Sequence, residues 1–145
     1  MTRSHKALCA AYALIAIAAL AGTASQVRPY LALGLLQGNV QFWQDTLVNG
    51  ASRFITVDIF FVFLVVWRWM LTESRRLNMR GIGWYFAGSL FVAFSAALPA
   101  FMLHRELARQ RQGETDAGTG LIGTLSVVAV AAGTIAYTWR ALLAT

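Results

Sequence analysis

Four long stretches of the chain carry almost no charge, and they constrain the fold more than any other feature of the sequence. They cover residues 7–24, 54–72, 83–103 and 119–139. Each is close to the ~20 residues that a helix needs to cross ~30 Å of hydrocarbon. The stretches are continuously apolar, whereas the strands of a membrane barrel alternate, so spanning helices are favoured. We therefore predict an all-α, polytopic membrane protein with four transmembrane helices, forming a single domain over residues 1–145.

The composition excludes a soluble globular domain. Charged side chains make up 12% of the chain and hydrophobic ones 58%, whereas an ordinary soluble domain has about 25% charged residues. Two prolines and one cysteine also exclude a collagen-like repeat and a disulfide scaffold. The net charge of +6 comes largely from bases near the ends of the apolar stretches, where they meet anionic lipid headgroups. We therefore expect the lipid bilayer, and no nucleic acid, as a partner.

The first apolar stretch has two interpretations. A basic start, an apolar run and then Gly22-Thr23-Ala24 are also typical of a cleavable secretory signal. The run is longer than the usual signal core of ~7–15 residues, so we favour a retained transmembrane helix over cleavage after Ala24.

Lysines and arginines predict the orientation, because cytoplasmic loops carry an excess of them. If the N-terminus is inside, the inner ends hold Arg3, Lys6, Arg68, Arg75, Arg76, Arg80 and Arg140. The outer segments then hold Arg28, Arg53, Arg105, Arg109 and Arg111. The strongest signal is the basic cluster of Arg75, Arg76 and Arg80 in the short link after the second stretch. We predict a bacterial inner-membrane protein with both termini in the cytoplasm.

The long outer link contains a predicted interfacial helix over about residues 39–49. Val40, Trp43, Leu47 and Val48 recur three or four residues apart, which is typical of a short helix lying on the membrane surface. Before it, Pro29 is expected to end or bend the first transmembrane helix. We favour a simple connecting role for this segment over a lid or a partner-binding element.

Asp58 is the charged residue that is most costly to keep in the membrane. A carboxylate in a span is penalised by about 2.5–3.5 kcal/mol at the bilayer centre and is a functional candidate. The same depth on an antiparallel third span is near Pro99, which leaves the carbonyl of Ser95 without its helical donor. Asp58 is then either a protonatable or cation-binding group, or a helix-pairing hydrogen bond to this region or to Arg53. We favour helix pairing.

Residue types that carry catalysis or bind metals are scarce. His5 and His104 lie far apart in sequence, and Cys9 has no nearby base, so we predict no catalytic residues, no metal site and no cofactor held by the chain's own ligands. Small residues recur at helical spacing in the third and fourth stretches, which favours close helix packing. They include Ser89, Ala93, Ala97, Ala129 and Gly133. Such faces also leave room for a bound lipid or pigment.

The sequence from about residue 29 to 110 resembles the DUF2834 (domain of unknown function) family of small bacterial membrane proteins. Its members show an Asn-x-x-x-x-Phe-x-x-x-Asp entry to a span, an Arg-Arg-Leu-Gly-Met-Arg-like inner loop and a Ser-x-Ala-Leu-Pro exit followed by Arg-Glu. The corresponding residues are Asn49, Phe54 and Asp58, then Arg75 to Arg80 with Asn78 where glycine is usual, then Ser95 to Pro99, Arg105 and Glu106. The resemblance implies the membrane fold and no particular activity, and the last apolar stretch departs from the family pattern.

We predict that the protein is a non-enzymatic accessory or assembly subunit of a larger bacterial membrane complex, of the respiratory or photosynthetic type. Other membrane subunits, or further copies of the chain, are the expected partners. The rival interpretation is a small transporter or channel component that uses Asp58 as a proton or cation site. A weaker alternative is a membrane enzyme that acts on lipids or isoprenoids.

Overall fold

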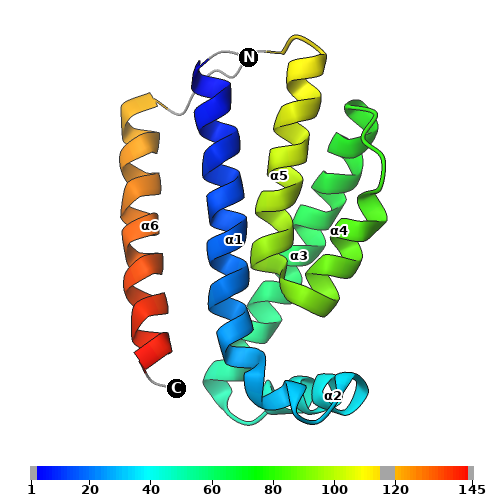
Figure 1. Cartoon of the computed structure of the whole chain (residues 1–145), viewed down its shortest axis with the longest axis vertical. Coiled ribbons are helices and arrows are strands. Elements are labelled where there is room, and N and C mark those ends of the chain that lie inside the picture. Colours follow the sequence, from blue (N-terminus) through cyan, green and yellow to red (C-terminus); the bar gives the residue numbers. More distant parts are fainter. Residues whose placement is uncertain (1–2, 115–119, 144–145) are drawn as a thin grey trace. The chain divides into compact units, whose positions relative to one another are not determined.

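The computed structural model describes residues 3–114 and 120–143, and within them every regular element is helical (Figure 1). The helices are α1 (Arg3–Leu31), α2 (Leu35–Asp45), α3 (Gly50–Arg76), α4 (Ile82–Gly88), the π-helical turn η1 (Ser89–Ala93), α5 (Phe94–Arg111) and α6 (Gly120–Leu143). Four helical segments are long and apolar enough to cross a membrane: His5–Leu31, Gly50–Arg76, Ile82–Arg111 and Gly120–Leu143. The predicted all-α class with four apolar membrane segments and a short additional helix is therefore confirmed.

The chain forms two compact units, Met1–Gly113 and Glu114–Thr145. The first contains α1 to α5, and the second contains α6. Within its own unit α6 buries no residue, so its apolar side chains, such as Leu121 (76% exposed) and Ile122 (84%), are available to lipid or to a partner helix. The predicted packing role of Ala129 and Gly133 in α6 stays a prediction.

Helix α2 lies across the end of α1, at the bottom of Figure 1. It begins after Gly34, whose φ of 82° favours glycine, and it ends at Asp45, so it is four residues earlier than predicted. The difference arises at Asn49, which does not end α2 but caps α3 through its Oδ1 atom, accepting from the Ser52 N–H at 2.9 Å. Helix α1 continues past Pro29 to Leu31, so the proline does not itself end the helix.

The contact between α1 and α2 depends on a glycine. A Cβ atom at Gly38 would lie 2.1 Å from the carbonyl oxygen of Tyr30, so no other residue fits this crossing without a shift of the backbone. The Tyr30 hydroxyl then donates to Asp45 Oδ2 at 2.7 Å, which fixes the far end of α2. Helix α2 is therefore attached to α1 by specific contacts.

The third apolar segment is not one continuous helix. Ala93 is extended (φ −167°, ψ 126°) where η1 meets α5, and the chain reverses direction there (Figure 1). The Tyr85 hydroxyl lies 3.0 Å from His104 Nδ1, although these residues would be about 28 Å apart along an unbroken helix. The expected straight span over residues 83–103 is thus a helical hairpin, with α4 and η1 as one arm and α5 as the other.

The hairpin reaches only part of the way along α3. At its tip, the Phe94 ring lies 5.2 Å from the Phe63 ring, near the middle of α3. Both open ends of the hairpin, at Ile82 and Arg111, are therefore on the side where α3 ends. The two arms of the hairpin lie close together, since a Cβ built at Gly88 would lie 3.8 Å from that of Ala97.

The buried side chains of the first unit gather at one end. We call this the cluster end: it is where α1 begins and where α3 and α5 end. The buried apolar side chains there are Cys9, Met70, Leu77, Phe101 and Ala108. The opposite end, where α1 ends and α3 begins, leaves large apolar side chains exposed, as lipid contact requires.

Candidate functional site

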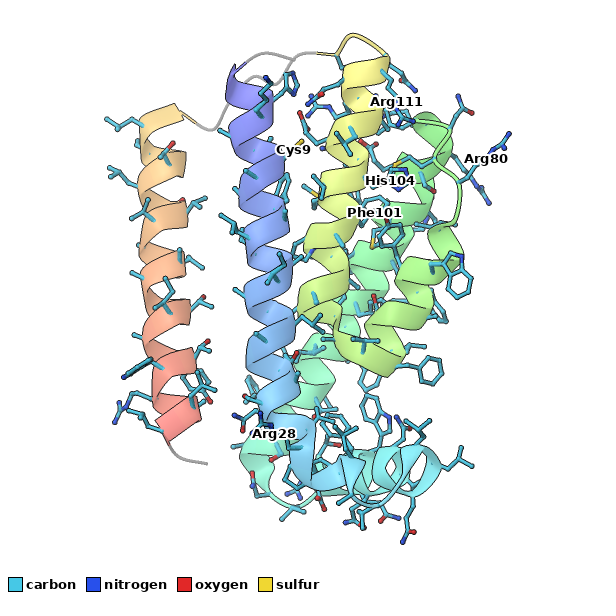
Figure 2. All side chains as sticks on the ribbon, viewed as in Figure 1. Cys9, Arg28, Arg80, Phe101, His104 and Arg111 are labelled. Carbon is cyan, nitrogen blue, oxygen red and sulfur yellow. The ribbon has the colours of Figure 1, made fainter. Side chains whose placement is uncertain are left out.

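The cluster end holds a set of paired charged side chains. This charged cluster consists of His5 from α1, Glu73 and Arg76 from α3, and Arg105, Glu106 and Arg109 from α5. In sequence some of these residues are more than a hundred positions apart, and the hairpin brings them together. Figure 2 shows the side chains of this region at the top of the view.

The first half of the charged cluster joins α1 to α5. Glu106 is 1% exposed and accepts from His5 Nδ1 with one carboxylate oxygen. Its other oxygen accepts from Arg109 Nη1 at 3.2 Å. A buried carboxylate is costly unless it is paired and hydrogen-bonded, and here both oxygens have partners. Glu106 therefore holds the start of α1 against the end of α5.

The second half joins α3 to α5. Glu73 accepts from Arg105 Nε at 2.6 Å and from Arg76 Nε and Nη2 at 2.8 Å each. The guanidinium of Arg105 also lies over the Trp69 ring, 5.5 Å from its centroid, in a cation–π contact. Because Arg105 and Glu106 are adjacent, α5 binds α1 with one residue and α3 with the next.

The polar side chains of the charged cluster are hydrogen-bonded to one another. Among the described residues, every buried side-chain nitrogen and oxygen has a hydrogen-bond partner. The same residues contain no group of three or more His, Cys, Asp or Glu side chains placed to hold a metal ion. The chemistry that the charged cluster itself supports is electrostatic fastening of three helices at one membrane face.

Sequence reasoning missed the charged cluster, and it separated His5 from the residues that it contacts. The available signal was the i, i+3 spacing of Glu73 with Arg76 and of Glu106 with Arg109. A straight third span would place the two acids on opposite sides of the membrane. The hairpin places them on the same side.

Among the described residues, no hydrogen bond joins Asp58 to the Ser95–Pro99 region, so the predicted pairing is not found. Phe101, just beyond Pro99, contacts Trp69, which is eleven residues from Asp58 and thus about 16 Å further along α3. The prediction assumed a straight third span antiparallel to α3, whereas α5 runs parallel to α3. Arg53 does not pair with Asp58 either, since its Nη1 atom donates to the Leu47 carbonyl at 2.8 Å.

Asp58 instead faces outward from the first unit. It is exposed, and it lines a shallow hollow of about 440 Å³ on one face of α3. The lining residues are Gly50, Arg53, Phe54, Val57, Asp58 and Phe61. Within residues 3–114 and 120–143, no hydrogen bond or ion pair to Asp58 is found.

The other predicted residues have clear positions. Arg75, Arg76 and Arg80 lie together at the cluster end, where Arg76 belongs to the charged cluster. The hairpin adds Arg105, Arg109 and Arg111 to the same end, which corrects their assignment to the outer side. Within the third segment, Ser89 donates to the Tyr85 carbonyl at 2.7 Å, and Ala93 is the residue at which the chain reverses.

The fold and the charged cluster together define a polytopic helical membrane protein whose helices are fastened at one face. The chain belongs to the family described as protein of unknown function DUF2834, whose sequence profile matches residues 11–107. The match covers most of α1 and all of α2 to η1, ends inside α5, and leaves α6 outside. No curated protein and no solved structure matches the chain.

Asn78 departs from the family pattern. It occupies the position where glycine is usual in the resemblance described above, and its φ is 51°. Asparagine tolerates this left-handed conformation better than other residues with a side chain. The turn after α3 therefore keeps its shape without glycine.

Proposed function

We propose that the protein is a non-enzymatic accessory or assembly subunit of a larger bacterial inner-membrane complex, of the respiratory or photosynthetic type. Its partner in this proposal is a transmembrane helix of another subunit. The observation that carries the proposal is the outward-facing carboxylate of Asp58 on α3, on a largely apolar face that also carries Arg53.

The two faces of α3 differ in what they contact. One face packs against the hairpin, with Phe63, Trp67 and Met70 directed inward. On the other face, Phe54 is 74% exposed and Phe61 is 67% exposed, and Asp58 lies between them one helical turn from each. This second face is the surface proposed to bind a partner.

The cost of Asp58 favours a protein partner over lipid. A carboxylate on a lipid-facing surface costs up to about 3 kcal/mol, and intramembrane acids almost always face another helix or a water-filled cavity. A partner helix that offers a hydroxyl, amide or basic side chain would remove this cost. The bulky aromatic side chains on either side would supply the surrounding apolar contact.

Site-specific photo-crosslinking in native membranes tests this proposal. A benzoylphenylalanine at position 61 of the full-length chain is expected to cross-link to a different membrane protein. Leu14 of α1 is a matched control, because Leu14 and Phe61 are both 67% exposed. Asp58→Leu is expected to abolish the cross-link from position 61 without unfolding the protein, since Asp58 has no partner among the described residues.

Several results would contradict the proposal. Cross-links from position 61 to lipid only, to the same chain only or to identical chains only would exclude a heterologous partner. Equal cross-linking from positions 14 and 61 would show that the contact is not specific to the face that carries Asp58.

A further inference from the structure

A second hollow lies at the cluster end, beside the charged cluster. It has a volume of about 370 Å³ and is enclosed by the link between α3 and α4 on one side and by the last turns of α5 on the other. The lining residues are Leu77, Asn78, Met79, Arg80, His104, Ala108, Arg111 and Gln112. Figure 2 labels Arg80, His104 and Arg111, which come from the two sides of this hollow.

The hollow is built on a fixed backbone. Asn78 makes the left-handed turn after α3, and the Met79 N–H then donates to the Ser74 carbonyl at 2.8 Å. Leu77 (4% exposed) and Ala108 (8%) form a buried apolar floor. The shape is therefore set by the turn and by the packing of α3 on α5, not by long flexible side chains.

In the described part of the chain, the arginines that line the hollow have no acidic partner. Both acids of the charged cluster already serve other bases: Glu73 binds Arg76 and Arg105, and Glu106 binds His5 and Arg109. Among the described residues, no carboxylate forms a salt bridge with Arg80 or Arg111. Within residues 3–114 and 120–143, Arg80 and Arg111 thus keep their charge and their N–H donors available for a ligand.

The neutral donors point to the same chemistry. His104 Nδ1 lies 3.0 Å from the Tyr85 hydroxyl, which orients the ring and leaves Nε2 without a hydrogen-bond partner among the described residues. The side-chain amides of Asn78 and Gln112 add further donors to the lining. Planar guanidinium groups with several neutral donors match the tetrahedral oxygens of phosphate.

We propose that this hollow binds a phosphate-bearing anion at the membrane face. The ligand is either the headgroup of an anionic phospholipid or a free phosphate compound, since both present the same charged oxygens. The apolar floor and Met79 suit the glycerol of a lipid, and the exposed ring of Trp84 (82%) in the adjoining α4 provides an anchor at headgroup depth. This site is independent of Asp58 and of the proposed partner helix.

Native mass spectrometry of the full-length protein in detergent tests the site with phosphatidylglycerol, phosphatidylcholine and inorganic phosphate as separate probes. We expect phosphatidylglycerol to bind at least about tenfold more tightly than phosphatidylcholine, and the double variant Arg80→Gln/Arg111→Gln to weaken it about 30-fold. Arg75→Gln is the control, because Arg75 is an exposed arginine at the same end that does not line the hollow. It is expected to bind as the wild type does.

The arms of the experiment separate the sources of the ligand. Equal binding of the two lipids, together with phosphate binding that the double variant loses, supports a free phosphate compound as the ligand. Equal binding of the two lipids without phosphate binding would overturn the proposal. Loss of binding in Arg75→Gln as large as in the double variant would also overturn it, because general charge attraction would then suffice.

Discussion

Glu106 shows what a single residue contributes to this fold. Its carboxylate is almost inaccessible to solvent, and its two oxygens bind residues from two helices, His5 of α1 and Arg109 of α5. Removing one member of a buried ion pair lowers the stability of the protein by more than the intact pair contributes, because the remaining partner stays desolvated. Stability at the cluster end should therefore depend on the pair and not on either residue separately.

A double-mutant cycle on His5 and Glu106 measures this dependence. His5→Ala and Glu106→Gln are each expected to lower the free energy of unfolding by about 1–3 kcal/mol. The double variant should lose less than the sum, with a coupling energy of about 1–2 kcal/mol, since each change removes the same contact. The measurement is reversible unfolding of the detergent-solubilised protein, followed by circular dichroism.

Arg75→Gln provides the reference for this cycle. Arg75 is exposed and outside the charged cluster, so its replacement should change the free energy of unfolding by less than about 0.5 kcal/mol. Additive effects of His5→Ala and Glu106→Gln would show that α1 and α5 are not joined through this pair.

Asp58 can be singled out from the sequence, whereas the role of Glu106 cannot, and the reason is physical. An acid inside an apolar stretch is conspicuous because its surroundings are uniform. Acids and bases near the ends of helices look like ordinary interface residues, and their pairing depends on how the helices are arranged. His5 and Glu106 could be joined only by a structure that returns α5 to the start of α1.

At the scale of elements, helix content and helix length follow from hydropathy, but the reversal in the third segment does not. Residues 83–103 are as apolar as a true span, and the reversal is set by the backbone at Ala93, which is neither glycine nor proline. Pro99, the apparent breaker, lies inside α5 without ending it. Hydropathy measures the affinity of a segment for lipid and carries no information on where its backbone turns.

A pair of cysteines distinguishes a hairpin from a straight span. A Cβ atom at position 88 would lie 3.8 Å from that of Ala97, which matches the mean Cβ–Cβ distance of a disulfide. In a Cys9→Ala background, Gly88→Cys/Ala97→Cys should therefore form an intramolecular disulfide on mild oxidation. Protection from a polyethylene-glycol maleimide, reversed by dithiothreitol, measures it on a gel.

The control pair is Ala87→Cys/Ala97→Cys, in which one cysteine is turned about 100° around α4. It should remain open to the maleimide under the same conditions. In an unbroken helix positions 88 and 97 would be about 13 Å apart, so failure of the first pair to close would argue for a straight span.

At the scale of the whole molecule, the hairpin changes the distribution of charge. The cluster end holds Lys6, Arg75, Arg76, Arg80, Arg105, Arg109 and Arg111. The opposite end of the first unit holds Arg28 and Arg53. The asymmetry is much larger than a straight third span gives, and the excess of basic residues favours the cluster end as the cytoplasmic side.

The same feature changes the expected side of the C-terminus. A straight third span places Gln112 outside and returns the chain to the cytoplasm through α6. With the hairpin, α5 ends at the cluster end, and the apolar helix α6 that follows in sequence has 24 residues, enough to cross the bilayer once. We therefore predict that the N-terminus is cytoplasmic and that α6 ends on the outer side, in place of two cytoplasmic termini.

Labelling of single cysteines in intact cells, with a maleimide that does not cross membranes, separates the two topologies. In a Cys9→Ala background, Val48→Cys and Leu143→Cys should react from outside, since both side chains are more than 70% exposed. Gln112→Cys should react only after the membrane is opened. A straight third span reverses two of these results: it exposes position 112 to the outside and protects position 143, whereas position 48 is external in both topologies and so controls for access of the reagent.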